Sequence, residues 1–208
     1  MAIIKGLHAK ITAELLKDVL EEKNYVFFDG NKALNLNIVG IRSSSRDSTK
    51  FDDTMLVVYR EEGTKDWLVH SYEITTEPGP SILRKPINPD GTAVLVPDQY
   101  RGVYKIDTHG GKNRHIALCQ RNGKVRVYRD TDRDSKPEET NTIQEGMYGI
   151  NIHRHPGPNE REYVRGASAG CQVFRDSKDF AEFMLLCNHA ADIYGNAFTY
   201  TLIEEGDL

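Results

Sequence analysis

The order of hydrophobic and polar positions predicts a helix, then a long series of strands, then a second helix and a closing strand. Between residues 11 and 22, apolar side chains recur three and four positions apart, which places them on one face of an amphipathic helix. Near the C-terminus, Asp176 is suited to cap a helix whose apolar stripe runs from Phe180 to Tyr194. A strand over residues 197–205 then ends the chain.

Between the two helices the pattern predicts strands. Short segments rich in Val, Ile, Tyr and Phe alternate with segments of turn-forming residues. The expected strands are 25–28, 36–42, 54–60, 67–76, 92–97, 100–106, 115–120, 125–130 and 147–153. Asn122 and Gly123 separate two of these strands and predict a β-hairpin. Residues 78–92 contain four prolines and predict an extended surface loop.

These elements predict a mainly β protein with flanking helices, in the α+β class. The chain has 208 residues, enough to bury one core without covalent cross-links. No internal repeat and no change of composition divides it. We therefore expect a single domain over residues 1–208.

Charge and hydropathy exclude several classes of partner. The net charge is −4, which gives no electrostatic reason to expect nucleic acid as the main partner. No segment approaches the roughly 18 apolar residues that a membrane-spanning helix needs. The first residues lack the apolar core of a signal peptide, so we expect synthesis in the cytoplasm. Any action outside the cell would then need lysis, injection or dedicated export.

The three cysteines lie in different contexts. They are odd in number and widely spaced, which fits neither a disulfide framework nor a metal knuckle. Cys187 lies on the apolar face of its helix and Cys119 lies inside an alternating strand, so packing roles are expected for both. Cys171 directly follows Ser168, Ala169 and Gly170, where small residues allow a turn that exposes backbone amides.

Cys171 has the surroundings of a thiol nucleophile. A thiol attacks as the thiolate and therefore needs a neighbouring base or positive charge. His153 or His155 can supply one if the intervening loop folds the two strands side by side. The amides of Gly170 and Cys171 are then candidates for an oxyanion hole.

This stretch resembles the catalytic domain of the YkuD-type L,D-transpeptidases. The residues concerned are INIHR at 150–154 and SAGCQVF at 168–174. The family's usual pattern is His-Gly, about 14 to 17 residues, and Ser-His-Gly-Cys. The resemblance implies a β-sandwich or barrel with a C-terminal helix and strand. It assigns the catalytic portion to residues 90–208 and leaves residues 1–90 unexplained.

The resemblance also implies a chemistry. Cys171 would be the nucleophile and His153 its general base, Ser168 would shape the loop, and Gly170 with the Cys171 amide would stabilise the oxyanion. The family attacks the carbonyl of the L-centre of the diamino acid in a peptidoglycan stem peptide. It expels the terminal D-residue and passes the acyl group to an amine or to water, without a metal or cofactor. Stem peptides of a bacterial cell wall are thus the expected partner, for a bacterial or bacteriophage protein.

Three positions depart from the family pattern. Arg154 replaces the glycine after the histidine, Ala169 replaces the motif histidine, and Gln172 replaces the Arg or Asn after the cysteine. Together with His155, these residues are expected to contact substrate. The departures suggest a divergent member that hydrolyses stem peptides, as a carboxypeptidase or endopeptidase, rather than cross-linking them.

Two alternatives remain open at this stage. His153, His155 and Cys171 are three potential zinc ligands, although Pro156 disfavours continued strand geometry after His155. A non-catalytic structural or interaction module is the other alternative, which the departures favour and the retained His-Cys pair disfavours. Histidines 109 and 115 are expected in a hairpin or loop, from which the second could approach the site.

Overall fold

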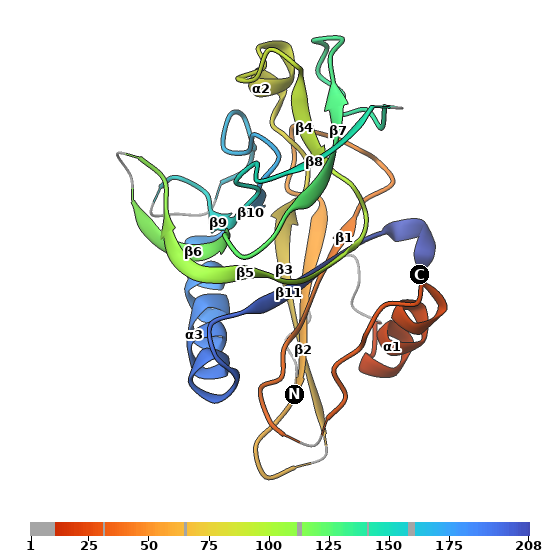
Figure 1. Cartoon of the computed structure of the whole chain (residues 1–208), viewed down its shortest axis with the longest axis vertical. Helices are drawn as coiled ribbons and strands as arrows, with labels where there is room; N and C mark the ends of the chain where they lie inside the picture. Colours follow the sequence, from red (N-terminus) through yellow and green to blue (C-terminus); the bar gives the residue numbers. More distant parts are fainter. Residues whose placement is uncertain (1–10, 31, 65, 112–113, 141, 158–160) are drawn as a thin grey trace.

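A computed structural model describes residues 11–30, 32–64, 66–111, 114–140, 142–157 and 161–208. Over this part the protein is mainly β, with two sheets, three α-helices and a C-terminal helix and strand (Figure 1). The helices are α1 (Ala13–Glu22), α2 (Pro80–Arg84) and α3 (Ser177–Tyr194). The strands are β1 (Asn37–Arg42), β2 (Asp53–Arg60), β3 (Trp67–Thr75), β4 (Thr92–Leu95), β5 (Gln99–His109), β6 (His115–Gln120), β7 (Val125–Asp130), β8 (Ile143–Gly146), β9 (Ile152–Arg154), β10 (Gln172–Phe174) and β11 (Phe198–Glu204).

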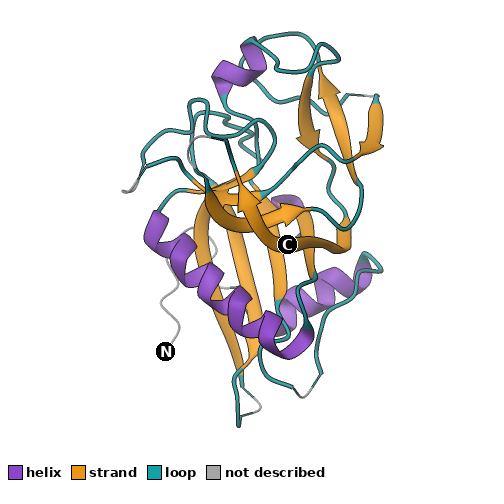
Figure 2. Ribbon diagram, turned by 60° about the vertical axis from the view of Figure 1, so that its left-hand side comes forward, coloured by secondary structure: helices purple, strands orange, loops and turns teal. Residues whose placement is uncertain are grey.

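Eight of these strands close into a barrel. Their order is β1-β11-β5-β6-β9-β10-β3-β2, so strands from the first 90 residues belong to the same barrel as β9 and β10. The remaining strands form a second sheet, β4-β7-β8, which lies with α2 at one end of the long barrel strands (Figure 1). Helices α1 and α3 flank the barrel (Figure 2).

The two longer helices form where apolar spacing and caps predict them. Thr12 caps α1, because its Oγ1 accepts the Leu15 N–H at 3.2 Å. The apolar face of α1 then packs on side chains of β1 and β2. Asp176 caps α3 by accepting the Lys178 N–H at 2.8 Å, which confirms the predicted start. The buried face of α3 packs against Phe174 of β10, whose ring lies 5.0 Å from that of Phe183.

The predicted hairpin around Asn122 and Gly123 is wrong. Strands β6 and β7, on either side of this turn, belong to different sheets. The amides of Arg121 and Asn122 donate instead to the Val103 carbonyl, at 3.2 and 3.0 Å. Strand β7 pairs with β4 and β8, so tertiary pairing overrides the local turn signal.

Other predicted elements need smaller corrections. Residues 25–28 are not a strand, because the amides of Val26 and Phe28 bond to the side chains of Gln99 and Asn37. The segment 147–153 is not one strand, since β8 ends before it and β9 begins within it. The loop 78–92 contains α2, which begins at Pro80, a favourable residue for a first helical position.

Arg42 connects the barrel to the second sheet. Its side chain is fully buried, and its Nε lies 3.1 Å from the carboxylate of Glu77, which is also buried. Its Nη2 donates to the Leu95 carbonyl at the end of β4, at 2.8 Å. A second buried carboxylate, that of Asp53, accepts the backbone amides of Ser43 and Thr76. Arg46 also pairs with Glu77, at 2.6 Å, so two guanidinium groups compensate its buried negative charge where the two sheets meet.

We predict that Arg42→Leu strongly destabilises the protein. The substitution removes one of the two guanidinium groups that pair with the buried Glu77 carboxylate, and Arg46 remains as the other, at 2.6 Å. It also leaves the Leu95 carbonyl without its donor, and loss of one partner from a buried pair costs up to about 3–5 kcal/mol. Urea denaturation measures the free energy of unfolding. Lys17→Leu is the matched control, because Lys17 forms a solvent-exposed pair with Asp29, and a much smaller change is expected there. Equal effects of the two substitutions would contradict the role given to Arg42.

Candidate functional site

Strands β9 and β10 bring the predicted nucleophile and base to one face. The strands pair in parallel, with Val173 opposite His153 and Gln172 opposite Ile152. Side chains alternate along a strand, so Cys171 and Val173 share a face, and His153 shares it with them. The strands thus lie side by side as the sequence predicts, but as a parallel pair and not as a hairpin.

The Cys171 thiol contacts two backbone groups. Its Sγ accepts the Asn151 N–H at 3.4 Å and lies 3.5 Å from the Gly149 carbonyl, to which the S–H can donate. Cys171 and Ala167 both pack against a small apolar cluster of Phe51, Val164 and Val173. Burial raises the pKa of the thiol to about 11, against the weaker opposing effect of the Asn151 amide. The resting group is a protonated thiol, which can attack only if a base removes its proton.

His153 is held in the form that such a base needs. Its side chain is buried, and its Nδ1 lies 2.8 Å from the Arg154 carbonyl. A carbonyl only accepts, so Nδ1 carries the proton and Nε2 is left with a free lone pair. Burial, reinforced by neighbouring His109, lowers the pKa of His153 to about 3. The imidazole is therefore neutral at ordinary pH.

A cluster of histidines surrounds this base. The ring of His109, from the end of β5, stacks on that of His153 with centroids 4.0 Å apart and planes 16° from parallel. His115, at the start of β6, pairs directly with His109, and its ring lies 6.0 Å from His153. Asn151 connects this stack to the thiol, because its Nδ2 lies 2.9 Å from His109 Nδ1 and its backbone N–H contacts Cys171.

The sequence did not single out His109 or Asn151 as site residues. The sequence feature that could have indicated His109 is the pair of alternating segments β5 and β6, joined by a short connection. Their pairing places His109 opposite His115. The step that brings both beside His153 is the pairing of β6 with β9, which joins Leu118 to Ile152. Local pattern does not reveal that pairing.

The turn before Cys171 is built by Ser168 and Gly170. Ser168 is buried, and its Oγ donates to the Cys171 carbonyl at 2.8 Å and accepts the Gly170 N–H at 3.1 Å. Gly170 has a φ of +112°, and a Cβ there would collide with the Ala93 carbonyl of β4. Ala169 lies half-buried between them. This turn therefore requires glycine and is fixed against the second sheet.

The same geometry changes the expected oxyanion hole. Because the Gly170 N–H is bonded to Ser168, it is not directed at a substrate. The Cys171 N–H donates to no acceptor within the part of the chain that the structure describes. Gly170 thus has a conformational role here, and the Cys171 amide is the remaining candidate for an oxyanion donor.

Two expected substrate contacts are not supported. Gln172 is fully buried on the opposite face of β10, where it accepts the Tyr200 hydroxyl at 2.8 Å and donates to the Gly170 carbonyl. His155 turns toward Phe51, with ring centroids 6.2 Å apart, and lines neither of the hollows beside His153. Gln172 therefore supports the turn before Cys171, and His155 packs against Phe51.

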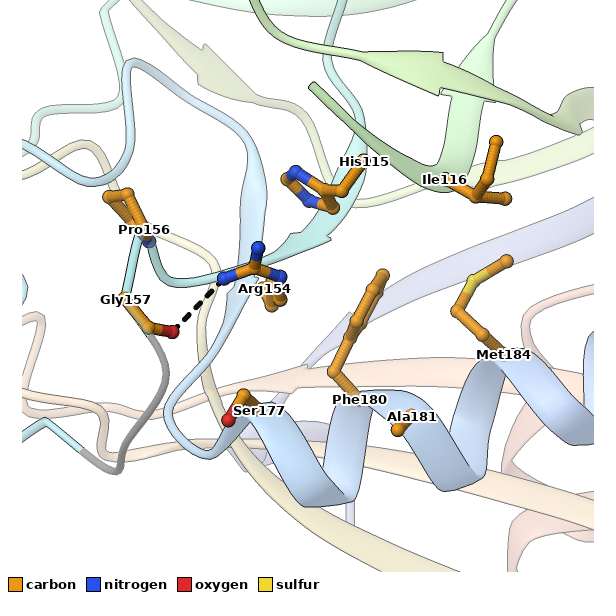
Figure 3. A pocket seen from close by; sticks show the side chains of 9 residues that line it. All are labelled: His115, Ile116, Arg154, Pro156, Gly157, Ser177, Phe180, Ala181 and Met184. Carbon is orange, nitrogen blue, oxygen red and sulfur yellow. Dashed lines mark hydrogen bonds between the residues drawn. The ribbon is translucent and has the colours of Figure 1, made fainter. Parts of the chain in front are cut away.

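Two adjoining hollows lie beside the base. The smaller, of about 160 Å³, is lined by His109, His153, Arg154 and Ala167 among others. The larger, of about 600 Å³, runs from Arg154 to the first turns of α3 (Figure 3). The two share four lining residues, namely His115, Arg154, Pro156 and Gly157. A ligand in the larger hollow can therefore extend to the base.

The zinc alternative is not supported by the geometry. Within the described ranges, no three His, Cys, Asp or Glu side chains lie so that they could hold a metal ion. This finding covers His153, His155 and Cys171.

Within the described part of the chain, no helix is long and apolar enough to cross a membrane. No family model, curated protein or solved structure matches the chain.

We predict that His153 stays neutral far into the acid range. Its folded pKa is lowered to about 3, so it should protonate only as the pH falls below about 4. His109→Ala removes the ring that covers it and should raise the pKa of His153 toward its ordinary value. Titration of the imidazole ¹⁵N resonances measures both, with the exposed His189 as a comparison in the same spectrum. A wild-type pKa for His153 above 6 would refute this description.

Proposed function

We propose that the protein is a cysteine-dependent acyl-transfer enzyme that acts on peptidoglycan stem peptides. One observation carries the proposal. The parallel β9–β10 pair brings a thiol and a neutral, Nδ1-protonated imidazole to one face, and the imidazole lines a hollow that adjoins a larger one. This is the arrangement that a thiol nucleophile and its general base need.

The reaction begins with proton transfer from Cys171 to Nε2 of His153. As the proton leaves, Sγ bonds to the carbonyl carbon of the substrate and the carbonyl π electrons move to oxygen. The Cys171 N–H donates to the oxyanion. When the intermediate collapses, the C–N bond breaks and the imidazolium gives its proton to the departing amine. The acyl group remains on sulfur as a thioester.

Resolution of the thioester returns the enzyme to its resting state. Water or an acceptor amine approaches the thioester carbon while His153 accepts its proton. The C–S bond then breaks, and sulfur recovers the proton. The low pKa of His153 suits the acid half of each step, because a buried imidazolium readily gives up its proton. Hydrolysis is the proposed outcome, since Ala169 replaces the histidine of the family motif.

The choice of stem peptides rests on the resemblance to the YkuD-type L,D-transpeptidases. The barrel with its helix α3 and closing strand β11 is compatible with that family, and we propose the same fold type. By this proposal the enzyme attacks the L-centre carbonyl of the diamino acid and releases the terminal D-residue. It would reach the cell wall after lysis, injection or dedicated export.

We predict that Cys171→Ala abolishes release of the D-residue from purified peptidoglycan, a loss of at least about a thousandfold. The thiol is the atom that bonds to the acyl group, so no other group replaces it. Mass spectrometry of the released stem peptides provides the measurement. Cys119→Ala is the matched control, because that thiol is buried on β6 and takes no part in the reaction.

Three outcomes separate the hypotheses. Loss of activity in Cys171→Ala alone, with activity retained in chelator, supports the thiol enzyme. Inhibition by chelator would favour metal chemistry. Release that persists in Cys171→Ala, or that is absent from the folded wild-type protein, would refute the proposal and favour a non-catalytic module.

A further inference from the structure

The larger hollow has the character of a binding subsite. It lies between the start of β6, the end of β9 and the first turns of α3, and its volume is about 600 Å³. Most of its wall is apolar, with Ile116, Phe180 and Met184 exposed to the space. Among the described residues that line it, Arg154 is the one with a formal charge. Pockets for small ligands combine an apolar wall with a few polar groups in this way.

The guanidinium of Arg154 is held in place but not neutralised. Its Nη1 donates to the carbonyls of His155 and Gly157, at 3.2 and 3.0 Å. These bonds fix the plane of the group and leave Nε and Nη2 for another acceptor. Within the described residues, no carboxylate pairs with Arg154. Figure 3 shows the guanidinium between Gly157 on one side and the rings of His115 and Phe180 on the other.

These features fit a carboxylate better than a more highly charged anion. A planar guanidinium binds a carboxylate through two parallel hydrogen bonds. A phosphate dianion would gain from a second cation, and none of the other described residues that line the hollow carries one. The start of α3 does not add one, because Asp176 caps it by accepting the Lys178 N–H. A single negative charge on an otherwise aliphatic chain is the complementary ligand.

We propose that Arg154 binds a carboxylate of the acyl-donor peptide and that the larger hollow receives the chain that carries it. This inference rests on the proposed function. Arg154 follows the base His153 directly and lines both hollows, so the bound carboxylate lies near the carbonyl under attack. A stem peptide whose diamino acid is diaminopimelate offers two such groups close to that carbonyl, the terminal carboxylate of the departing D-residue and the side-chain carboxylate of the diaminopimelate. Arg154 is thus a specificity determinant.

The test compares three synthetic stem tetrapeptides. One has all its carboxylates free, one is amidated at the terminus, and one is amidated on the diamino acid side chain. For the wild type, amidation of the recognised group should lower kcat/KM about tenfold to a hundredfold, mainly through KM, because one charge-assisted pair is lost. Arg154→Gln should show that loss with the free peptide and no further loss on amidation. The sensitive peptide identifies which carboxylate is bound.

Two matched variants complete the design. Arg154→Lys keeps the charge without the planar fork and should recover part of the discrimination. Arg101→Gln, an exposed position on β5, should behave as the wild type. Equal losses for all three peptides in Arg154→Gln, or no effect of amidation on the wild type, would overturn the inference while leaving the thiol mechanism intact.

Calorimetry with Cys171→Ala separates failure of the inference from failure of the proposed function. If the wild type turns over no peptide, the proposed function fails. The subsite would still be supported if Cys171→Ala binds the free tetrapeptide and one amidation weakens that binding about tenfold. The double variant Cys171→Ala, Arg154→Gln should bind the free tetrapeptide about tenfold more weakly as well. Absence of binding, or binding indifferent to both changes, would reject it.

Discussion

The parallel pairing of β9 with β10 is the constraint on which the candidate site depends. Side chains alternate along each strand, so a register shift of one residue would move Cys171 to the opposite face from His153. The pairing is fixed from both sides, because β10 also pairs with β3 and β9 with β6. It is reinforced at the thiol itself, where the Asn151 N–H meets Cys171 Sγ. The barrel thus positions the nucleophile through backbone contacts.

Burial sets the chemistry of the pair. It raises the pKa of Cys171 and lowers that of His153, so both groups are neutral at rest. The proposed mechanism therefore relies on proton transfer during attack and not on a preformed thiolate–imidazolium pair. The stacked ring of His109 also lowers the pKa of His153, because a neighbouring imidazole disfavours protonation of His153. In the proposed mechanism the thiol reacts only with a bound carbonyl, whose developing oxyanion accepts the Cys171 N–H.

Much of the fold and part of the site could be predicted from the sequence. Periodic apolar spacing identified α1 and α3, and the alternating segments identified most strands, because these patterns are local. The small residues before Cys171 distinguished it from the buried Cys119 and Cys187. Where the prediction failed, a long-range contact decided the outcome. Strand β7 pairs with β4 rather than with β6, despite the turn at 122–123.

The same reason explains the errors within the site. Gln172 directly follows Cys171 in the chain. Because side chains alternate along β10, Gln172 points into the barrel, where it accepts the Tyr200 hydroxyl. His109 lies 44 positions before His153 in the sequence, and only the β6–β9 pairing brings them into contact. Its place in the stack follows from topology, which a single sequence does not contain.

A covalent acyl-enzyme is the central claim, and acid-quenched mass spectrometry tests it most directly. The wild type would be mixed with a stem tetrapeptide, quenched during turnover and digested with trypsin. Residues 166–175 form one tryptic peptide that contains Cys171 and neither of the other cysteines. The account predicts an acyl adduct on that peptide, with the mass of the donor less its terminal residue. Product formation without this adduct, or with an adduct on Cys119 instead, would contradict it.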